Sequence, residues 1–151
     1  MPISRQRRPL NPIMSTDAAL HDYLAHLLDS AIQPQLWVIV LDDDSRQVGP
    51  FMPGSDLPDD PDEPVGSVDL GLTTSAALLS HRMPVFAEAA GGTQIVLVWE
   101  RPGSARLSKA ESRWARRMTN GCRGLDVRLR AQFLLHDDGL KFIPPVYALE
   151  S

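Results

Sequence analysis

Two unbroken apolar runs constrain the fold of this chain more than any other feature of its sequence. Residues 36–41 (LWVIVL) and 94–99 (QIVLVW) are rich in β-branched side chains and do not alternate between polar and apolar positions. Such a run is typical of a strand that is covered on both faces. A segment of helical composition, residues 73–90, separates the two runs, and a crossover of this kind favours parallel pairing between them. The sequence therefore predicts an α/β fold, a three-layer α-β-α sandwich around a mixed β-sheet.

Capping residues and periodicity predict the other elements. Leucines at helical spacing indicate a first helix that begins near Thr16 and ends at about residue 31. A helix over residues 108–123 is expected to be capped by Ser108 and stopped by Gly124. Pro84 is expected to kink the helix at residues 73–90 or to divide it in two. Further strands are expected at 47–52, 66–70, 127–135 and 140–143, the last two joined by a turn at 136–139.

The length and composition fit a single domain. A chain of 151 residues can build one hydrophobic core but not two. Residues 1–14 have three arginines, three prolines and no periodicity, so we expect a disordered basic tail there and the domain at residues 15–151, with Met14 as an alternative start. Cys122 is the only cysteine, no apolar segment follows the N-terminal arginines, and no apolar run reaches the roughly 18 residues that cross a bilayer. We therefore expect a cytoplasmic protein that does not contact membranes.

The net charge of −4 conceals a segregation of acids from bases. Residues 42–69 hold nine acids and one base, whereas residues 101–130 hold nine bases and two acids. This asymmetry can steer a partner or pair two copies of the chain, or it can reflect a solvated basic helix beside an acidic loop. Residues 53–64 contain four prolines and five acids, so we expect an exposed, mobile loop.

A basic stripe is expected on the helix at 108–123, opposite Trp114 and Met118. The stripe comprises Lys109, Arg113, Arg116, Arg117 and Arg123. It has the chemistry to follow a nucleic-acid backbone, although it lacks the interleaved aromatic residues that stack on bases. The simpler alternative is a charged face that is solvated.

The most specific motif lies at residues 99–111 (WERPGSARLSKAE). It resembles the RadC-like branch of the JAB/MPN metallopeptidase family, in which His-x-His-Pro is followed by a short loop and by Ser-x-x-Asp at the start of a helix. Pro102 and Ser108 match the proline and the serine of this pattern. Glu111 stands at the aspartate position, and Trp99 and Arg101 stand at the two histidine positions. The loop is one residue shorter than in the family.

The resemblance covers about residues 36–143 and implies a JAB/MPN architecture, which is cytidine-deaminase-like. In the family, two imidazoles and one carboxylate hold zinc, and a glutamate takes a proton from the metal-bound water. An indole and a guanidinium have no lone pair to offer a metal, so neither Trp99 nor Arg101 can act as a ligand. Residues 46–53, where the general base is expected, contain no acid. The resemblance therefore implies a degenerate metal site with no metal, no cofactor and no catalytic residue.

These considerations favour a catalytically inactive JAB-like domain, a pseudoenzyme that acts as a binding or scaffolding module. Its partner is an unknown protein or a second copy of the chain. One alternative is a nucleic-acid-associated protein that uses the basic helix at 109–123. Another is a hydrolase with relocated metal ligands, for instance His81 or His136 together with Glu111. Cys122 falls on an apolar helix face and is expected to pack there rather than to react.

One contact can be predicted at the degenerate site. Glu111 shares the inward face of its helix with Trp114 and Met118, and an inward carboxylate without a metal needs a counter-charge. Arg101 is placed by the motif to supply that charge. We therefore expect Arg101 and Glu111 to form a salt bridge with Trp99 packed beside it, the alternative being that Glu111 turns towards solvent.

Overall fold

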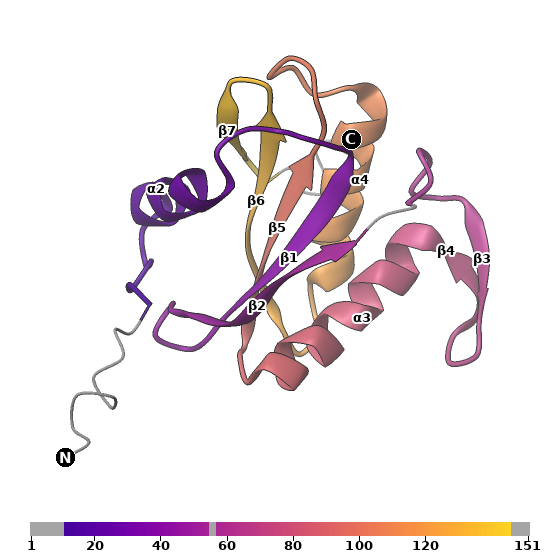
Figure 1. The fold of residues 1–151 in the computed structure, drawn as a ribbon. Coiled ribbons are helices and arrows are strands. Elements are labelled where there is room, and N and C mark those ends of the chain that lie inside the picture. Colours follow the sequence, from indigo (N-terminus) through magenta and orange to yellow (C-terminus); the bar gives the residue numbers. More distant parts are fainter. Residues whose placement is uncertain (1–10, 55–56, 146–151) are drawn as a thin grey trace.

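The computed structural model describes residues 11–54 and 57–145 of the chain (Figure 1). Its elements, in chain order, are α2 (Asp17–Leu28), β1 (Gln35–Leu41), β2 (Gln47–Gly54), β3 (Pro64–Ser67), β4 (Gly71–Thr74), α3 (Ser75–Ala90), β5 (Gln94–Glu100), α4 (Lys109–Cys122), β6 (Arg128–His136) and β7 (Gly139–Ile143). Most of the predicted tail, residues 1–10, lies outside the described residues, as do residues 146–151.

Five strands form one mixed sheet in the order β2-β1-β5-β6-β7. Strands β5 and β6 are parallel, and the other neighbouring pairs are antiparallel. Helices α3 and α4 pack on one face of this sheet, and α2 packs on the other (Figure 1). The predicted α/β class, the mixed sheet and the helices on both of its faces are therefore confirmed. The β3–β4 hairpin forms a second, two-stranded sheet beside α3.

The predicted parallel pairing of the two apolar runs is wrong. Strands β1 and β5 are antiparallel, with Gln35 opposite Glu100 and Leu41 opposite Gln94. The cause is β2, which reverses the chain before α3 begins. The crossover through α3 consequently joins β2 to β5, which run in the same direction on either side of β1. The rule that a helical crossover joins parallel strands holds, but for β2 and β5 rather than for β1 and β5.

The folded part of the chain begins before the predicted boundary at residue 15. The Met14 side chain is only 1% exposed and packs with α2 against the sheet. The Met14 amide donates a hydrogen bond to the Ser45 carbonyl oxygen at 2.9 Å, and the Asn11 side-chain amide donates to the Gln47 carbonyl oxygen at 2.9 Å. Residues 11–14 therefore belong to the domain, because they lie along the β1–β2 hairpin.

Helix α3 runs through Pro84 as a single helix, so of the two predicted alternatives, a kink or a division, the division does not occur. Proline removes one hydrogen bond from the helical ladder, and the rest of α3 is held by its packing on α4. The two helices approach closely where Gly121 faces Ser80, since a Cβ atom at Gly121 would lie 2.3 Å from the Ser80 hydroxyl oxygen. Helix α3 ends at Ala90, the predicted boundary, and its C-cap Gly91 adopts a left-handed conformation with φ of 82°.

The acidic segment 57–64 packs against the protein rather than extending freely. The Trp114 indole donates a hydrogen bond to the Pro58 carbonyl oxygen at 2.9 Å, and Pro61 is buried. The backbone amides of Ser75 and Ala76 bind the carbonyl oxygens of Glu63 and Pro61, both at 2.9 Å. Most of residues 57–64 are exposed, as predicted, but Pro61 is buried and these contacts hold the segment against α3 and α4. Residues 55 and 56 of the predicted loop lie outside the described residues.

Candidate functional site

The four positions of the predicted degenerate site lie together. Trp99 and Arg101 come from the end of β5 and the residue after it, whereas Ser108 and Glu111 come from the start of α4. All four line one cleft of about 280 Å³. Residues 34–36, the end of β2 and residues 57–59 form its other walls. The motif thus positions these side chains as expected, at the junction between β5 and α4.

Arg101 and Glu111 form the predicted salt bridge. The Arg101 Nε atom lies 2.7 Å from Glu111 Oε2, and the Arg101 Nη2 atom lies 3.2 Å from Glu111 Oε1, which makes the contact bidentate. The two side chains are 21% and 23% exposed, so the pair is partly shielded from water. Arg101 also donates to the carbonyl oxygens of Ser104 and Arg106. Its guanidinium group therefore binds its own loop as well as the helix.

Glu111 has a second role as a helix-capping residue. The Ser108 hydroxyl accepts a hydrogen bond from the Glu111 amide at 3.1 Å, and Glu111 Oε1 accepts one from the Ser108 amide at 2.8 Å. This reciprocal capping box begins α4. Burial would raise the pKa of Glu111, but the hydrogen bonds from Arg101 and Ser108 and the charge of Arg101 outweigh it and lower this pKa. The carboxylate is therefore ionised at neutral pH.

The wall of the cleft contains two tryptophan rings in contact. The centroids of Trp99 and Trp114 are 5.6 Å apart. The Trp99 indole donates a hydrogen bond to Gln132 Oε1 at 2.8 Å, and the Trp114 indole donates to the Pro58 carbonyl oxygen. Both N–H groups are thus occupied within the protein. Trp114 is buried, so the apolar ring surface that a bound molecule could contact is that of the half-buried Trp99.

Sequence reasoning missed the most buried carboxylate in this region. The side chain of Glu100 is 5% exposed and accepts four hydrogen bonds from neutral groups. The donors are the amides of Ile32 at 2.6 Å and Gln33 at 3.1 Å, the Gln35 side chain at 2.9 Å and the Trp37 indole at 2.7 Å. Burial would raise the pKa of Glu100, but these hydrogen bonds outweigh it and lower this pKa. The sequence feature that could have identified Glu100 is an acid at the end of an apolar strand. The structure places it opposite Gln35 of β1.

Two arginines of the basic stripe form ion pairs with the acidic segment. Arg113 Nη2 lies 2.7 Å from Asp62 Oδ2 and 3.1 Å from Asp60 Oδ1, and Arg117 Nε lies 2.8 Å from Asp62 Oδ1. The hydrogen bond from Arg117 is the main reason that the pKa of Asp62 is lowered. Lys109 and Arg123 are exposed, and Arg116 is half-buried. The segregated acids and bases of the sequence thus meet within one chain.

The other candidate residues lie apart from the cleft. His81 is exposed on α3, and the His136 ring at the end of β6 accepts a hydrogen bond from the Asp138 amide. Cys122 is buried, and burial raises the pKa of its thiol to about 11, which agrees with a packing role. Within residues 11–54 and 57–145, no three histidine, cysteine or acidic side chains are grouped so that they could hold a metal ion.

No family model matches the chain, and no curated protein matches it in sequence. The resemblance to the RadC-like branch therefore depends on the residues of the cleft themselves. These residues do not fit the zinc ion of that family. Trp99 and Arg101 have no lone pair for a metal, and both oxygens of Glu111 already accept hydrogen bonds from Arg101. Among the helices of the described part of the chain, none has the length and apolar character to cross a membrane.

Proposed function

We propose that this chain is a catalytically inactive JAB-like domain that acts as a binding or scaffolding module. The observation that carries the proposal is the bidentate pair of Arg101 and Glu111 in the cleft. In the family that the motif resembles, a carboxylate at the position of Glu111 binds a metal cation. Here a guanidinium group from a histidine position neutralises that carboxylate, so the charge is balanced without a metal.

The chemistry of the cleft supports binding rather than hydrolysis. A hydrolase of this kind needs a polarised water and a free base, and Glu111 has both oxygens engaged. Glu100 accepts four hydrogen bonds and is buried, so it is not a free base either, and Asp59 is an exposed residue of the cleft wall outside the motif. The apolar part of the lining includes the half-buried Trp99 ring, Leu57 and Pro58, which suit an apolar side chain of a partner protein.

The proposal can be tested by metal analysis of the full chain and of a restored variant. We expect the purified protein to hold no stoichiometric zinc after expression in zinc-supplemented medium and to cleave no peptide bond. The variant Trp99→His/Arg101→His/Glu111→Asp replaces the three ligand positions with the family's residues, and we expect it to bind one zinc ion. Stoichiometric zinc or chelator-sensitive peptidase activity in the unmodified protein would contradict inactivity. A restored variant that binds no zinc would contradict the JAB-like assignment.

The nucleic-acid alternative receives less support from the structure. Arg113 and Arg117 are bound to Asp60 and Asp62, so a phosphate group would have to compete with carboxylates that are already in place. The alternative predicts salt-dependent binding to nucleic acid that is lost in Arg113→Ala/Arg116→Ala/Arg117→Ala. The absence of binding at low salt would exclude it.

A further inference from the structure

Part of the sheet edge at β6 has no neighbouring strand among the described residues. Strand β6 begins at Arg128, but β7 pairs only with its second half, from Gln132 to His136. The Arg128 amide donates to the Thr93 carbonyl oxygen, on the β5 side. Because backbone groups alternate along a strand, those of the next residue, Leu129, point towards the open side. The main-chain groups of Leu129 thus lack a partner strand among the described residues, the feature to which an added strand binds. The register with β5 shifts just after Leu129, at Arg130.

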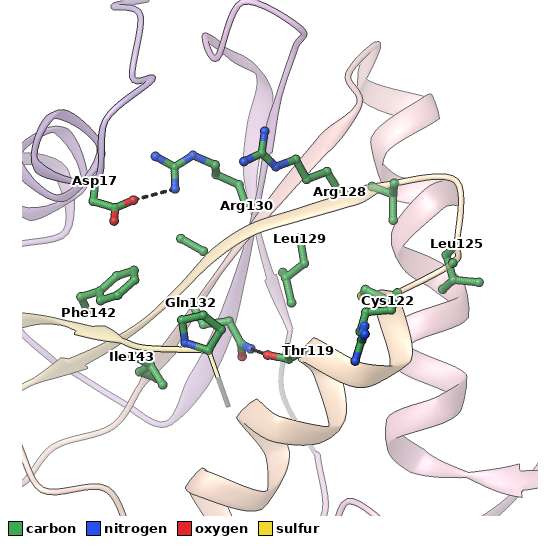
Figure 2. A pocket seen from close by; sticks show the side chains of 15 residues that line it. Asp17, Thr119, Cys122, Leu125, Arg128, Leu129, Arg130, Gln132, Phe142 and Ile143 are labelled. Atoms are coloured by element: carbon green, nitrogen blue, oxygen red, sulfur yellow. Dashed lines mark hydrogen bonds and ion pairs between the residues drawn. The ribbon is translucent and has the colours of Figure 1, made fainter. Parts of the chain in front are cut away.

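A cavity of about 600 Å³ lies along this open edge (Figure 2). The end of α4 and the turn at residues 123–125 form one wall, and Asp17 of α2 lies on the opposite side. Phe142 and Ile143 of β7 close one end, and Pro145 follows them. Proline has no amide hydrogen, so the chain cannot continue the β7 ladder at residues 144 and 145. Residues 144 and 145 therefore do not extend β7 along the first half of β6.

The two faces of the open edge differ in chemistry. Arg128 and Arg130 project on one side of β6, and Leu129 projects on the other (Figure 2). Arg130 is bound to Asp17 at 2.8 Å and has a side chain only 9% exposed, whereas Arg128 is exposed and makes no ion pair within the described residues. On the other face, Leu125 and Cys122 line the cavity together with Leu129. A strand placed here would meet a cation on one face and an apolar surface on the other.

We propose that this edge binds an extended peptide segment of a partner protein, which pairs with β6 at Leu129, in the half of the strand that β7 does not cover. The segment carries an acidic residue that faces Arg128 and apolar residues, at alternating positions, that face Leu125 and Leu129. The acidic segment of a second copy is a poor occupant, because Pro58, Pro61 and Pro64 remove main-chain donors from it. This inference rests on the binding role proposed above and names its partner class, but it concerns a different surface from the β5–α4 cleft.

The test measures binding of a synthetic peptide to the full chain by fluorescence anisotropy. The probe is a fluorescein-labelled peptide of eight to ten residues that alternates glutamate with valine or threonine. We expect it to bind, and we expect a peptide N-methylated at alternate residues, which cannot form the ladder, to bind at least about tenfold more weakly. Replacing the glutamates with lysines should weaken binding to a similar degree, because the cation would face Arg128.

Charge reversal of the protein supplies the matched control. We expect Arg128→Glu to lose the acidic peptide and to gain the lysine peptide, whereas Arg82→Glu, an exposed position on α3, should change neither. The proposal is overturned if the acidic peptide does not bind, or if its binding is indifferent to N-methylation and to Arg128. It is equally overturned if the peptide binds only a chain that ends at residue 145, since residues 146–151 would then be the natural occupant. Zinc content reports on the cleft alone, so failure of either proposal can be recognised separately.

Discussion

Glu100 and Glu111 stand at the two ends of one loop, and the protein stabilises their charges in different ways. Glu111 is 23% exposed and is bound by the guanidinium group of Arg101. Glu100 is 5% exposed and is bound by two backbone amides, a carboxamide and an indole, none of which is charged. In both residues the pKa is lowered although burial acts to raise it.

The difference between the two residues follows from the free-energy cost of burying charge. This cost determines whether a neutral or a charged group is the better partner of a carboxylate. A second charge brought into the interior would itself lose its hydration, so neutral donors are the better partners where water is excluded. Nearer the surface the cation keeps part of its hydration, and a bidentate pair adds fixed geometry. Glu100 is thus a structural acid that holds residues 32–37 against the end of β5, whereas Glu111 connects a loop to a helix.

The largest effect should come from removing Glu100. In Glu100→Ala the amides of Ile32 and Gln33 and the Trp37 indole lose their acceptor at a part-buried site, and a donor that stays unsatisfied costs about 1–3 kcal/mol. With partial relaxation, we expect the free energy of unfolding to fall by about 3–4 kcal/mol, measured by urea denaturation. Glu88→Ala, at an exposed position on α3, should change it by less than about 0.5 kcal/mol. A loss below about 1 kcal/mol for Glu100→Ala would mean that water replaces the carboxylate.

Removing Arg101 should cost less, which would sharpen the comparison between the two acids. Exposed ion pairs contribute less than about 1 kcal/mol, and breaking a buried pair costs about 3–5 kcal/mol. At 21% and 23% exposure, we expect Arg101→Ala to destabilise the protein by about 2 kcal/mol. A double-mutant cycle with Glu111→Ala should give a coupling free energy of about 1–2 kcal/mol. If Arg101→Ala lowers the free energy of unfolding more than Glu100→Ala does, this account of the two acids is wrong.

Acidification should reduce stability through both residues. Since their pKa values are lowered in the folded protein, each contributes stability that is fully present above the unfolded value of about 4.3 and is lost as the pH falls through the folded value. We expect the urea midpoint to fall as the pH is lowered from 5 to about 3. In Glu111→Gln it should fall less over that range, whereas Glu88→Gln should follow the unmodified protein. If the urea midpoint fell equally with pH in all three proteins, Glu111 would have no shifted pKa.

The smallest effect is expected at the acidic segment. In Asp62→Asn the ion pairs with Arg113 and Arg117 are lost, but these side chains are 36–42% exposed, so the stability should fall by less than about 1 kcal/mol. The difference from the unmodified protein should shrink in about 0.5 M salt, because salt screens exposed charges. Asp69→Asn, in the turn between β3 and β4, serves as the matched control. An effect of Asp62→Asn that does not respond to salt would point to packing instead.

The features that the sequence predicted are those encoded by local patterns. Both apolar runs became buried strands, Ser108 caps α4, and the motif spacing brought Arg101 and Glu111 together. Each of these depends on residues close together in the chain or on one burial pattern. The resemblance to the RadC-like branch added the pairing of Arg101 with Glu111, which composition alone would not predict.

The features that were missed depend on how distant segments meet. The direction of β1 against β5 was set by β2, whose two glycines and two prolines gave a weaker strand signal than the two apolar runs. Glu100 looked like a residue at the end of a strand until the register placed Gln35 and Trp37 beside it. The docking of residues 57–64 needed the position of α4, which is fixed only after the sheet is assembled.

The continuous unit β5–α4–β6 has a consequence for the order in which the chain folds. Its two parallel strands are joined by residues 101–127, and the capping box and the Arg101–Glu111 pair fasten the start of that connection. Strand β1 reaches β5 only across residues 42–93, a longer loop whose closure costs more entropy. We therefore expect residues 94–136 to form the folding nucleus, so that substitutions there slow folding while those in the β1–β2 hairpin mainly accelerate unfolding.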